Sequence, residues 1–119
     1  MKDIKWLLDV EEHDYPAAES YLSLLFDEEM VKDMIEALRN SDIKEFKAKD
    51  IFRASKLSLL GVSNSHVVKN IKKIEKGKAI SPLLLVKYEE NKLIIADGYH
   101  RLCAIYSYDE DALIPCKII

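Results

Sequence analysis

Apolar and polar residues alternate with different periods along this chain, and the changes of period predict an α+β fold. Apolar residues follow helical spacing in residues 13–26, where Pro16 falls near the first turn, and again in residues 27–40, which Asp27 would cap. The apolar face expected of the second helix consists of Met30, Met34, Ile35 and Leu38. We therefore expect residues 1–43 to form a helical extension that packs on the domain that follows.

The middle of the chain changes from a short strand to a basic helix. Residues 43–49 predict the strand, and Asp50 is placed to cap a helical turn over residues 51–57. Three capping residue types then precede a longer helix, namely Ser63, Asn64 and Ser65. The apolar face of that helix is expected to contain Val67, Val68, Ile71 and Ile74, and Gly77 stands where a terminating glycine belongs.

The last third has a β-α-β character. Continuous apolar runs at residues 81–89 and 93–96 predict two buried strands joined as a hairpin by a short polar turn. Residues 99–108 are helix-like, and residues 112–119 form a final strand. Together with residues 44–80, these elements predict one small mixed-sheet domain over residues 44–119.

Length and composition predict a single domain of a cytoplasmic protein of bacterial type. The chain has 119 residues, of which 49% are hydrophobic and 33% charged, so it can bury a core without cross-links. Cys103 and Cys116 lie in apolar surroundings, which indicates reduced core thiols. The apolar stretch at the start is too short for a signal peptide, and no run has the length of a membrane span.

The net charge of −3 conceals a strong asymmetry along the chain. Residues 1–43 carry a net charge of −8, residues 44–78 carry +7 and residues 79–119 carry −2. This division indicates a middle segment suited to anions and an acidic leader able to shield it. The alternative is that both segments are solvated faces without a partner.

The candidate chemistry lies in "IIADGYHRLCAIY", residues 94–106. A buried strand ends at Asp97-Gly98, and Tyr99-His100-Arg101 open a helix. The first turn of a helix presents unpaired N–H groups that favour phosphate, and the side chains of His100 and Arg101 add donors. Asp97 would then hold a metal ion, orient His100 or act as a base.

A purely structural interpretation of this junction is also open. Asp97 would then cap the helix, Gly98 would form a turn, and His100 and Arg101 would belong to a solvated first turn. Cationic residues in a first turn oppose the helix dipole, which favours a functional reason for their presence.

The basic helix supplies further candidates. His66, Lys69 and Lys73 fall at positions i, i+3 and i+7, with Ser65 beside them. Such a stripe is usually an exposed face, but next to a second anion-favouring site it would close the other side of a phosphate pocket.

Residues 44–119 resemble the ParB/sulfiredoxin superfamily. The resemblance ends on "DGYHRLCA", which is similar to that superfamily's Gly-x-x-Arg-x-x-Ala element, here Gly98, Arg101 and Ala104. It implies a small α/β unit that binds nucleotides at this junction. In sulfiredoxins the corresponding His and Arg contact phosphate, which carries over to His100 and Arg101.

Departures from the family patterns narrow the expected activity. Tyr99 replaces the catalytic cysteine of sulfiredoxins, so sulfinic acid reduction is not expected. ParB-type partition proteins have a Gly-Glu-Arg-Arg version for CTP followed by a helix-turn-helix domain, whereas this chain ends after the matching segment. The version with Asp97, Gly98, His100 and Arg101 resembles the free-serine kinases of the superfamily, which use ADP.

We therefore predict a nucleotide-dependent phosphotransferase or hydrolase that uses ATP, ADP or CTP with Mg²⁺. Asp97 and His100 would be catalytic, and Asp97 would also be the Mg²⁺ ligand. The residues predicted to hold phosphate are Gly98, Tyr99, His100, Arg101, Ser65, His66, Lys69 and Lys73. One alternative is a non-catalytic nucleotide-sensing or protein-interaction module whose N-terminal helices contact a second copy or a partner. A third, ranked last, is a nuclease or DNA-binding protein that uses residues 44–78.

Overall fold

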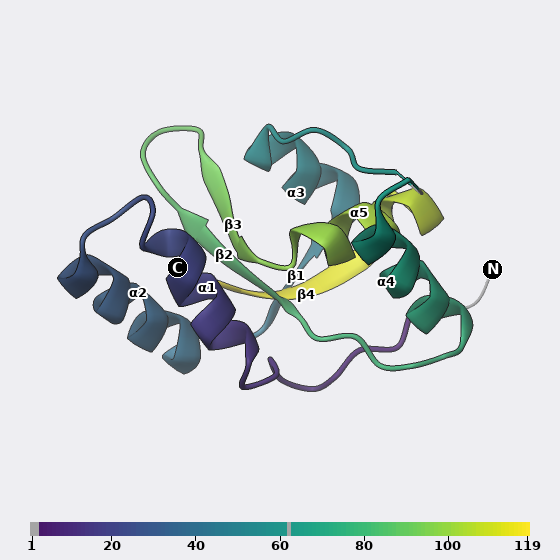
Figure 1. Cartoon of the computed structure of the whole chain (residues 1–119), viewed down its shortest axis with the longest axis horizontal. Coiled ribbons are helices and arrows are strands. Elements are labelled where there is room, and N and C mark those ends of the chain that lie inside the picture. The colour runs from purple at the N-terminus through teal and green to yellow at the C-terminus, as the bar shows by residue number, and fades with distance from the viewer. Residues whose placement is uncertain (1–2, 62) are drawn as a thin grey trace.

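A four-stranded mixed sheet lies between two layers of helices (Figure 1). The computed structural model describes residues 3–61 and 63–119, and within them the α+β class is confirmed. The helices are α1 (Asp14–Leu22), α2 (Glu28–Asn40), α3 (Ala48–Ser55), α4 (Ser65–Glu75) and α5 (Tyr99–Tyr108). The strands are β1 (Lys44–Lys47), β2 (Leu83–Lys87), β3 (Leu93–Asp97) and β4 (Leu113–Ile118).

The strand order is β1-β4-β2-β3. The predicted hairpin is present, because β2 and β3 pair antiparallel. The final strand, β4, runs parallel to β2 on one side and antiparallel to β1 on the other. The strand β3 therefore lies at one edge of the sheet, and its last residue, Asp97, leads directly into α5.

Each face of the sheet has its own hydrophobic core, as strand alternation requires. Leu83 and Leu85 of β2 point to the core shared with α3, α4 and α5. Leu84 and Val86 point to the core shared with α1 and α2. All four side chains are at most 2% exposed, so β2 is covered on both faces.

The N-terminal helices form one of the two layers that cover the sheet. Val10, Ala18 and Leu22 are buried against β2 and β3, and Val31 and Ile35 of α2 belong to the same core. In the segment before α1, backbone hydrogen bonds join residues 5–7 to Ile80. Residues 3–40 thus share their core with the sheet and are an integral layer of the fold, and the domain boundary at residue 43 stays a prediction.

Most predicted helix ends are present, with one correction to the start of a helix and one to an apolar face. The side chain of Asp27 accepts a hydrogen bond from the N–H of Met30, and that of Asn64 accepts from the first turn of α4. The prediction that Asp50 caps α3 is wrong, because α3 begins at Ala48 and Asp50 lies in its first turn. On α2 the buried stripe is Val31, Ile35 and Leu38, whereas Met30 is 43% exposed.

Both cysteines are buried and unpaired, as predicted. Burial raises the pKa of the Cys116 thiol to about 12 and also raises the pKa of Cys103. Both thiols therefore stay protonated near neutral pH and act as core residues. Within the described residues, no helix is both long and apolar enough to span a lipid bilayer.

Gly98 determines how β3 turns into α5. Its φ is +108°, a conformation that side chains with a Cβ rarely adopt. A Cβ at this position would lie 2.7 Å from Cγ of Leu83 in the core. The glycine is thus required by the backbone turn and by close packing on β2.

We expect Gly98→Ala to lower the free energy of unfolding by about 2–4 kcal/mol, since it combines backbone strain with overpacking. Gly61→Ala is the matched control, because a Cβ there meets no atom within 4 Å. Urea unfolding followed by circular dichroism measures both variants. Equal stability of the two variants would contradict this account of the turn.

Candidate functional site

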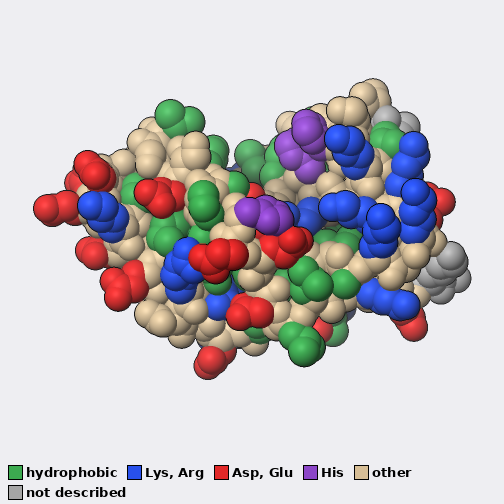
Figure 2. Space-filling model, turned by 60° about the horizontal axis from the view of Figure 1, so that its bottom comes forward, with side chains coloured by type: hydrophobic (Ala, Val, Ile, Leu, Met, Phe, Trp, Pro, Cys, Tyr) green, Lys and Arg blue, Asp and Glu red, His purple; other side chains and the backbone are tan. Residues whose placement is uncertain are grey.

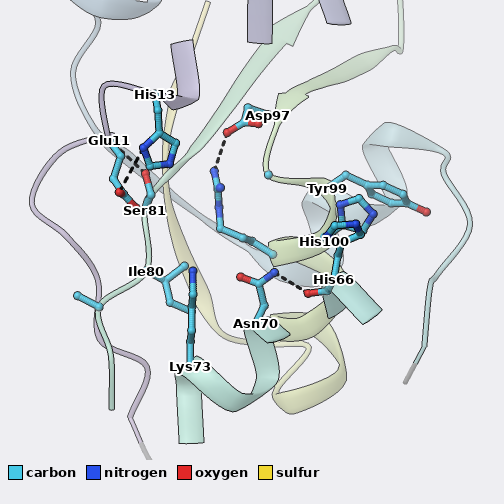
Figure 3. Close-up of a pocket in the computed structure, with 13 residues that line it drawn as sticks. Glu11, His13, His66, Asn70, Lys73, Ile80, Ser81, Asp97, Tyr99 and His100 are labelled. Carbon is cyan, nitrogen blue, oxygen red and sulfur yellow. Dashed lines mark hydrogen bonds and ion pairs between the residues drawn. The ribbon is translucent and has the colours of Figure 1, made fainter. Parts of the chain in front are cut away.

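A cavity of about 220 Å³ opens at the N-terminal end of α5 (Figure 3). We call it the histidine cavity. Its walls come from four parts of the chain: the segment before α1, one face of α4, the loop before β2 and the junction of β3 with α5. The lining residues are Glu11, His13, His66, Asn70, Lys73, Ala79, Ile80, Ser81, Asp97, Gly98, Tyr99, His100 and Arg101.

All three histidines of the chain line this one cavity, although they are far apart in the sequence. The rings of His66 and His100 lie side by side, with their centroids 4.9 Å apart. His13 enters from the wall formed by the segment before α1 (Figure 3). His13 and Glu11 were missed at the sequence level, since only the fold brings the acidic leader to this site.

The face of α4 that meets the cavity differs by one residue from the predicted stripe. His66, Asn70 and Lys73 line the cavity, at positions i, i+4 and i+7. Ser65 and Lys69, both predicted to hold phosphate, are exposed and are not among the lining residues. Asn70 was missed because the prediction followed charge, whereas its spacing of four from His66 would have indicated it.

Arg101 forms the back wall of the cavity and is held there by two carboxylates. Its Nη2 donates to Asp97 Oδ2 at 3.1 Å and to the carbonyl oxygen of Pro82 at 3.2 Å, and lies 3.4 Å from Asp14 Oδ2. Its side chain is only 17% exposed. These contacts all come from Nη2, whereas Nε is buried and has no hydrogen-bond partner among the described residues, so only part of the donor capacity of Arg101 is used within the protein.

Asp14 connects this arginine to the N-terminal layer. It is 3% exposed, and its Oδ2 also accepts a 2.6 Å hydrogen bond from the hydroxyl of Ser81. Ser81 Oγ in turn accepts from the N–H of Glu11 at 3.0 Å, and His13 Nε2 lies 3.4 Å from Asp14 Oδ1. Asp14 is thus the buried centre of a polar network that holds two walls of the cavity together.

Asp97 is neither a helix cap nor part of a metal cluster in this structure. The N-cap of α5 is Gly98, and no side chain caps the helix. Among the described residues no group of three His, Cys, Asp or Glu side chains is placed to hold a metal ion. Burial raises the pKa of Asp97, with the nearby carboxylate of Asp14 adding to the shift and Arg101 opposing it.

The environment of His100 keeps its ring neutral. Burial lowers the pKa of His100, and the neighbouring ring of His66 lowers it further. A neutral imidazole offers one donor and one acceptor, so at neutral pH a contact of His100 with phosphate would be a hydrogen bond rather than an ion pair.

Tyr99 lines the cavity but directs its hydroxyl away from it. That hydroxyl donates to the carbonyl oxygen of Ser58, and burial raises the pKa of Tyr99. The side chain thereby fastens the segment before α4 to the first turn of α5. Any phosphate contact of Tyr99 would come from its backbone N–H at the helix start.

A second, more apolar cavity adjoins the first across the start of α5. Its volume is about 390 Å³, and it shares Asp97, Gly98, Tyr99 and His100 with the histidine cavity. The remaining lining residues are Ala17, Tyr21, Leu57, Ile95 and Ala96. A polar and an apolar compartment therefore meet at the same turn, and we call the second one the apolar cavity.

The charge asymmetry of the sequence is also an asymmetry in space. Figure 2 shows Lys and Arg gathered at the end of this face that carries α4, while Asp and Glu predominate toward the end that carries α2. The histidine side chains lie between the two regions (Figure 2). The histidine cavity thus has a basic wall on the side of α4 and an acidic one on the side of the leader.

Comparison of the chain with protein-family models, with curated proteins and with solved structures finds no match. The resemblance to the ParB/sulfiredoxin superfamily accordingly stays a prediction, and the functional argument depends on the geometry of the cavities.

Asp14 and Asp97 should differ in their effect on stability. We expect Asp14→Asn to lower the free energy of unfolding by about 2–4 kcal/mol, because it removes one charge from a buried ion network. Asp97→Asn should cost less than about 0.5 kcal/mol at pH 7, since its raised pKa shows that the native fold disfavours its charge. Denaturant titrations measure both values, and the reverse order would refute this ranking.

Proton binding by His100 should depend on His66. The pKa of His100 lies below its ordinary value of about 6.5. The stability that neutral His100 contributes is therefore complete above about pH 6.5, and it is lost as the pH falls through the lowered pKa. We expect His66→Gln to raise the pKa of His100 part of the way to the ordinary value. NMR titration of the imidazole signals measures this, and His13→Gln is the control that should leave the pKa of His100 unchanged. A larger shift of the His100 pKa in His13→Gln than in His66→Gln would contradict the pairing of His66 with His100.

Proposed function

We propose that the chain binds a nucleotide, with the phosphates in the histidine cavity and the nucleoside in the adjoining apolar cavity. The observation that carries the proposal is that all three histidines and Lys73 meet at the N-terminal end of α5. Unpaired N–H groups of the first helical turn, a lysine and imidazole donors are the groups that bind phosphate in proteins.

The apolar cavity supports a nucleotide over a simple phosphate ester. It lies directly beside the phosphate compartment, and Tyr21 and Leu57, each 43% exposed, line it. An aromatic and an aliphatic side chain offer planar, apolar contact of the kind that a base or ribose needs. A ligand that places its anionic end at Gly98 would have room for such a group on the other side of the turn.

The resemblance to free-serine kinases suggests phosphoryl transfer as the reaction. In that case a hydroxyl oxygen of the acceptor would attack the terminal phosphorus, and the bond from phosphorus to its bridging oxygen would break. Asp97 or His100 would take the hydroxyl proton. The raised pKa of Asp97 brings its proton affinity closer to that of a base working near neutral pH.

One observation favours binding without catalysis. An oxygen of Asp97 already accepts a hydrogen bond from Arg101 at 3.1 Å, so this carboxylate is engaged within the protein. A nucleotide-sensing module with the same cavity is therefore the second candidate function.

Calorimetry with ATP, ADP and CTP, with and without Mg²⁺, tests the nucleotide proposal. We expect Lys73→Ala to weaken binding about tenfold, the loss typical of one charge-assisted hydrogen bond to phosphate. Lys69→Ala is the matched control on the same helix and should leave affinity within about twofold, because its side chain does not line the cavity.

Five results would overturn the proposal or choose between its forms. Absence of binding for all three nucleotides, or equal losses in the two lysine variants, would contradict the phosphate site. Pyrophosphate binding as tight as nucleotide binding would remove the role of the apolar cavity. Release of phosphate or transfer to a hydroxyl acceptor, lost in Asp97→Asn, would establish catalysis, whereas binding without turnover would favour the sensing module.

A further inference from the structure

A separate cavity of about 340 Å³ lies at the opposite, C-terminal end of α5. Its lining residues are Asp3, Ile4, Trp6, Tyr108, Asp109, Ala112 and Leu113. None of them lines the histidine cavity or the apolar cavity. We call it the aromatic cavity, because an indole and a phenol ring form part of its wall beside two carboxylates.

The described residues that line the aromatic cavity carry a negative charge. Asp3 and Asp109 line it, and no basic residue is among its described lining residues. Two lysines on the neighbouring segments, Lys5 and Lys49, are directed elsewhere. Lys5 Nζ lies 3.7 Å from the place where a Cβ on Gly77 would stand. Lys49 Nζ forms an ion pair with Asp111 at 2.7 Å.

The end of α5 adds to this negative potential. The helix ends at Tyr108, Asp109 is its C-cap residue, and its last turn contains no basic side chain. The carbonyl groups at a helix C-terminus carry partial negative charge, which a cation stabilises and a carboxylate opposes. An aspartate at this position opposes the helix dipole, although its Oδ1 also accepts a hydrogen bond from the N–H of Asp111, and a bound cation would offset the repulsion.

The aromatic residues indicate which kind of cation fits. Trp6 and Tyr108 are partly buried and pack against the core of α3, α4 and α5, so their placement is fixed by the fold. Indole and phenol rings attract cations with diffuse charge and apolar surface. A hard metal ion instead needs several oxygen ligands, and the described residues contain no such group of three.

We propose that the aromatic cavity binds a small organic cation that carries an alkylated ammonium group. Asp109 and the end of α5 supply the negative charge, while Trp6 and Tyr108 contact the alkyl groups of the cation. This site is independent of the proposed nucleotide site, which lies at the other end of the same helix. Failure of either proposal leaves the other untouched.

The single tryptophan of the chain provides a specific probe, because Trp6 gives the only indole N–H signal in the NMR spectrum. We expect tetramethylammonium chloride to move this signal saturably at constant ionic strength. The neutral molecule of the same shape, tert-butanol, should cause a much smaller change, and sodium chloride none beyond the salt effect. Equal responses to tetramethylammonium and tert-butanol would show that the cavity does not select charge, and would overturn the proposal.

Two aspartate variants on one loop complete the test. Asp109→Asn should weaken tetramethylammonium binding about fivefold, the factor that corresponds to about 1 kcal/mol for a solvent-exposed charge pair. It keeps the side-chain oxygen that accepts the N–H of Asp111, so the loop is preserved. Asp111→Asn is the matched control, because Asp111 does not line the cavity. Equal weakening in both variants, or no saturable shift in the wild type, would refute the site.

Tyr108→Leu keeps the apolar contact and removes the aromatic ring. We expect it to weaken tetramethylammonium binding at least as much as Asp109→Asn, while binding of tert-butanol is unchanged. Unchanged affinity for tetramethylammonium in this variant would also contradict the proposal.

Discussion

The guanidinium of Arg101 between the carboxylates of Asp14 and Asp97 is the interaction on which the rest of this structure depends. It joins α1, through Asp14, to two consecutive elements that are distant from it in sequence: β3 through Asp97 and α5 through Arg101 itself. The carbonyl of Pro82 and the hydroxyl of Ser81 add the loop before β2 to the same cluster. Because buried charges are stable only when paired, this cluster fixes how the N-terminal layer sits on the sheet and thereby forms the histidine cavity.

The same cluster changes the chemistry of the junction. A single guanidinium faces two carboxylates, so the wall behind the cavity carries no excess of positive charge. Burial in this wall raises the pKa of Asp97. In the proposed function, the attraction for an anion would come largely from the first turn of α5, from Lys73 and from histidine donors. Through the contacts of its Nη2, Arg101 positions the wall of the cavity, and its first-turn location, which opposes the dipole of α5, is explained by its two acidic partners.

The helix α5 organises both ends of the molecule. Its positive end, at Gly98, faces the cavity that contains the three histidines, and its negative end, at Asp109, faces a cavity with two aromatic rings. The segment before α1 and the segment before β2 run along the same side and contribute to these walls. One helix dipole would thus favour an anion at one of these places and a cation at the other.

The sequence by itself determined the elements and most of their ends. Apolar periodicity, the capping side chains of Asp27 and Asn64, and the turn at Gly98 are local properties, and the helices, the hairpin and the strand-to-helix junction follow from them. Only the tertiary structure decided which face of α4 meets the junction, since a rotation of one residue exchanges Lys69 for Asn70. It also decided that Arg101 pairs with Asp14, which lies 87 residues earlier in the chain. The free energy of pairing buried charges depends on distance in space and not on separation along the chain.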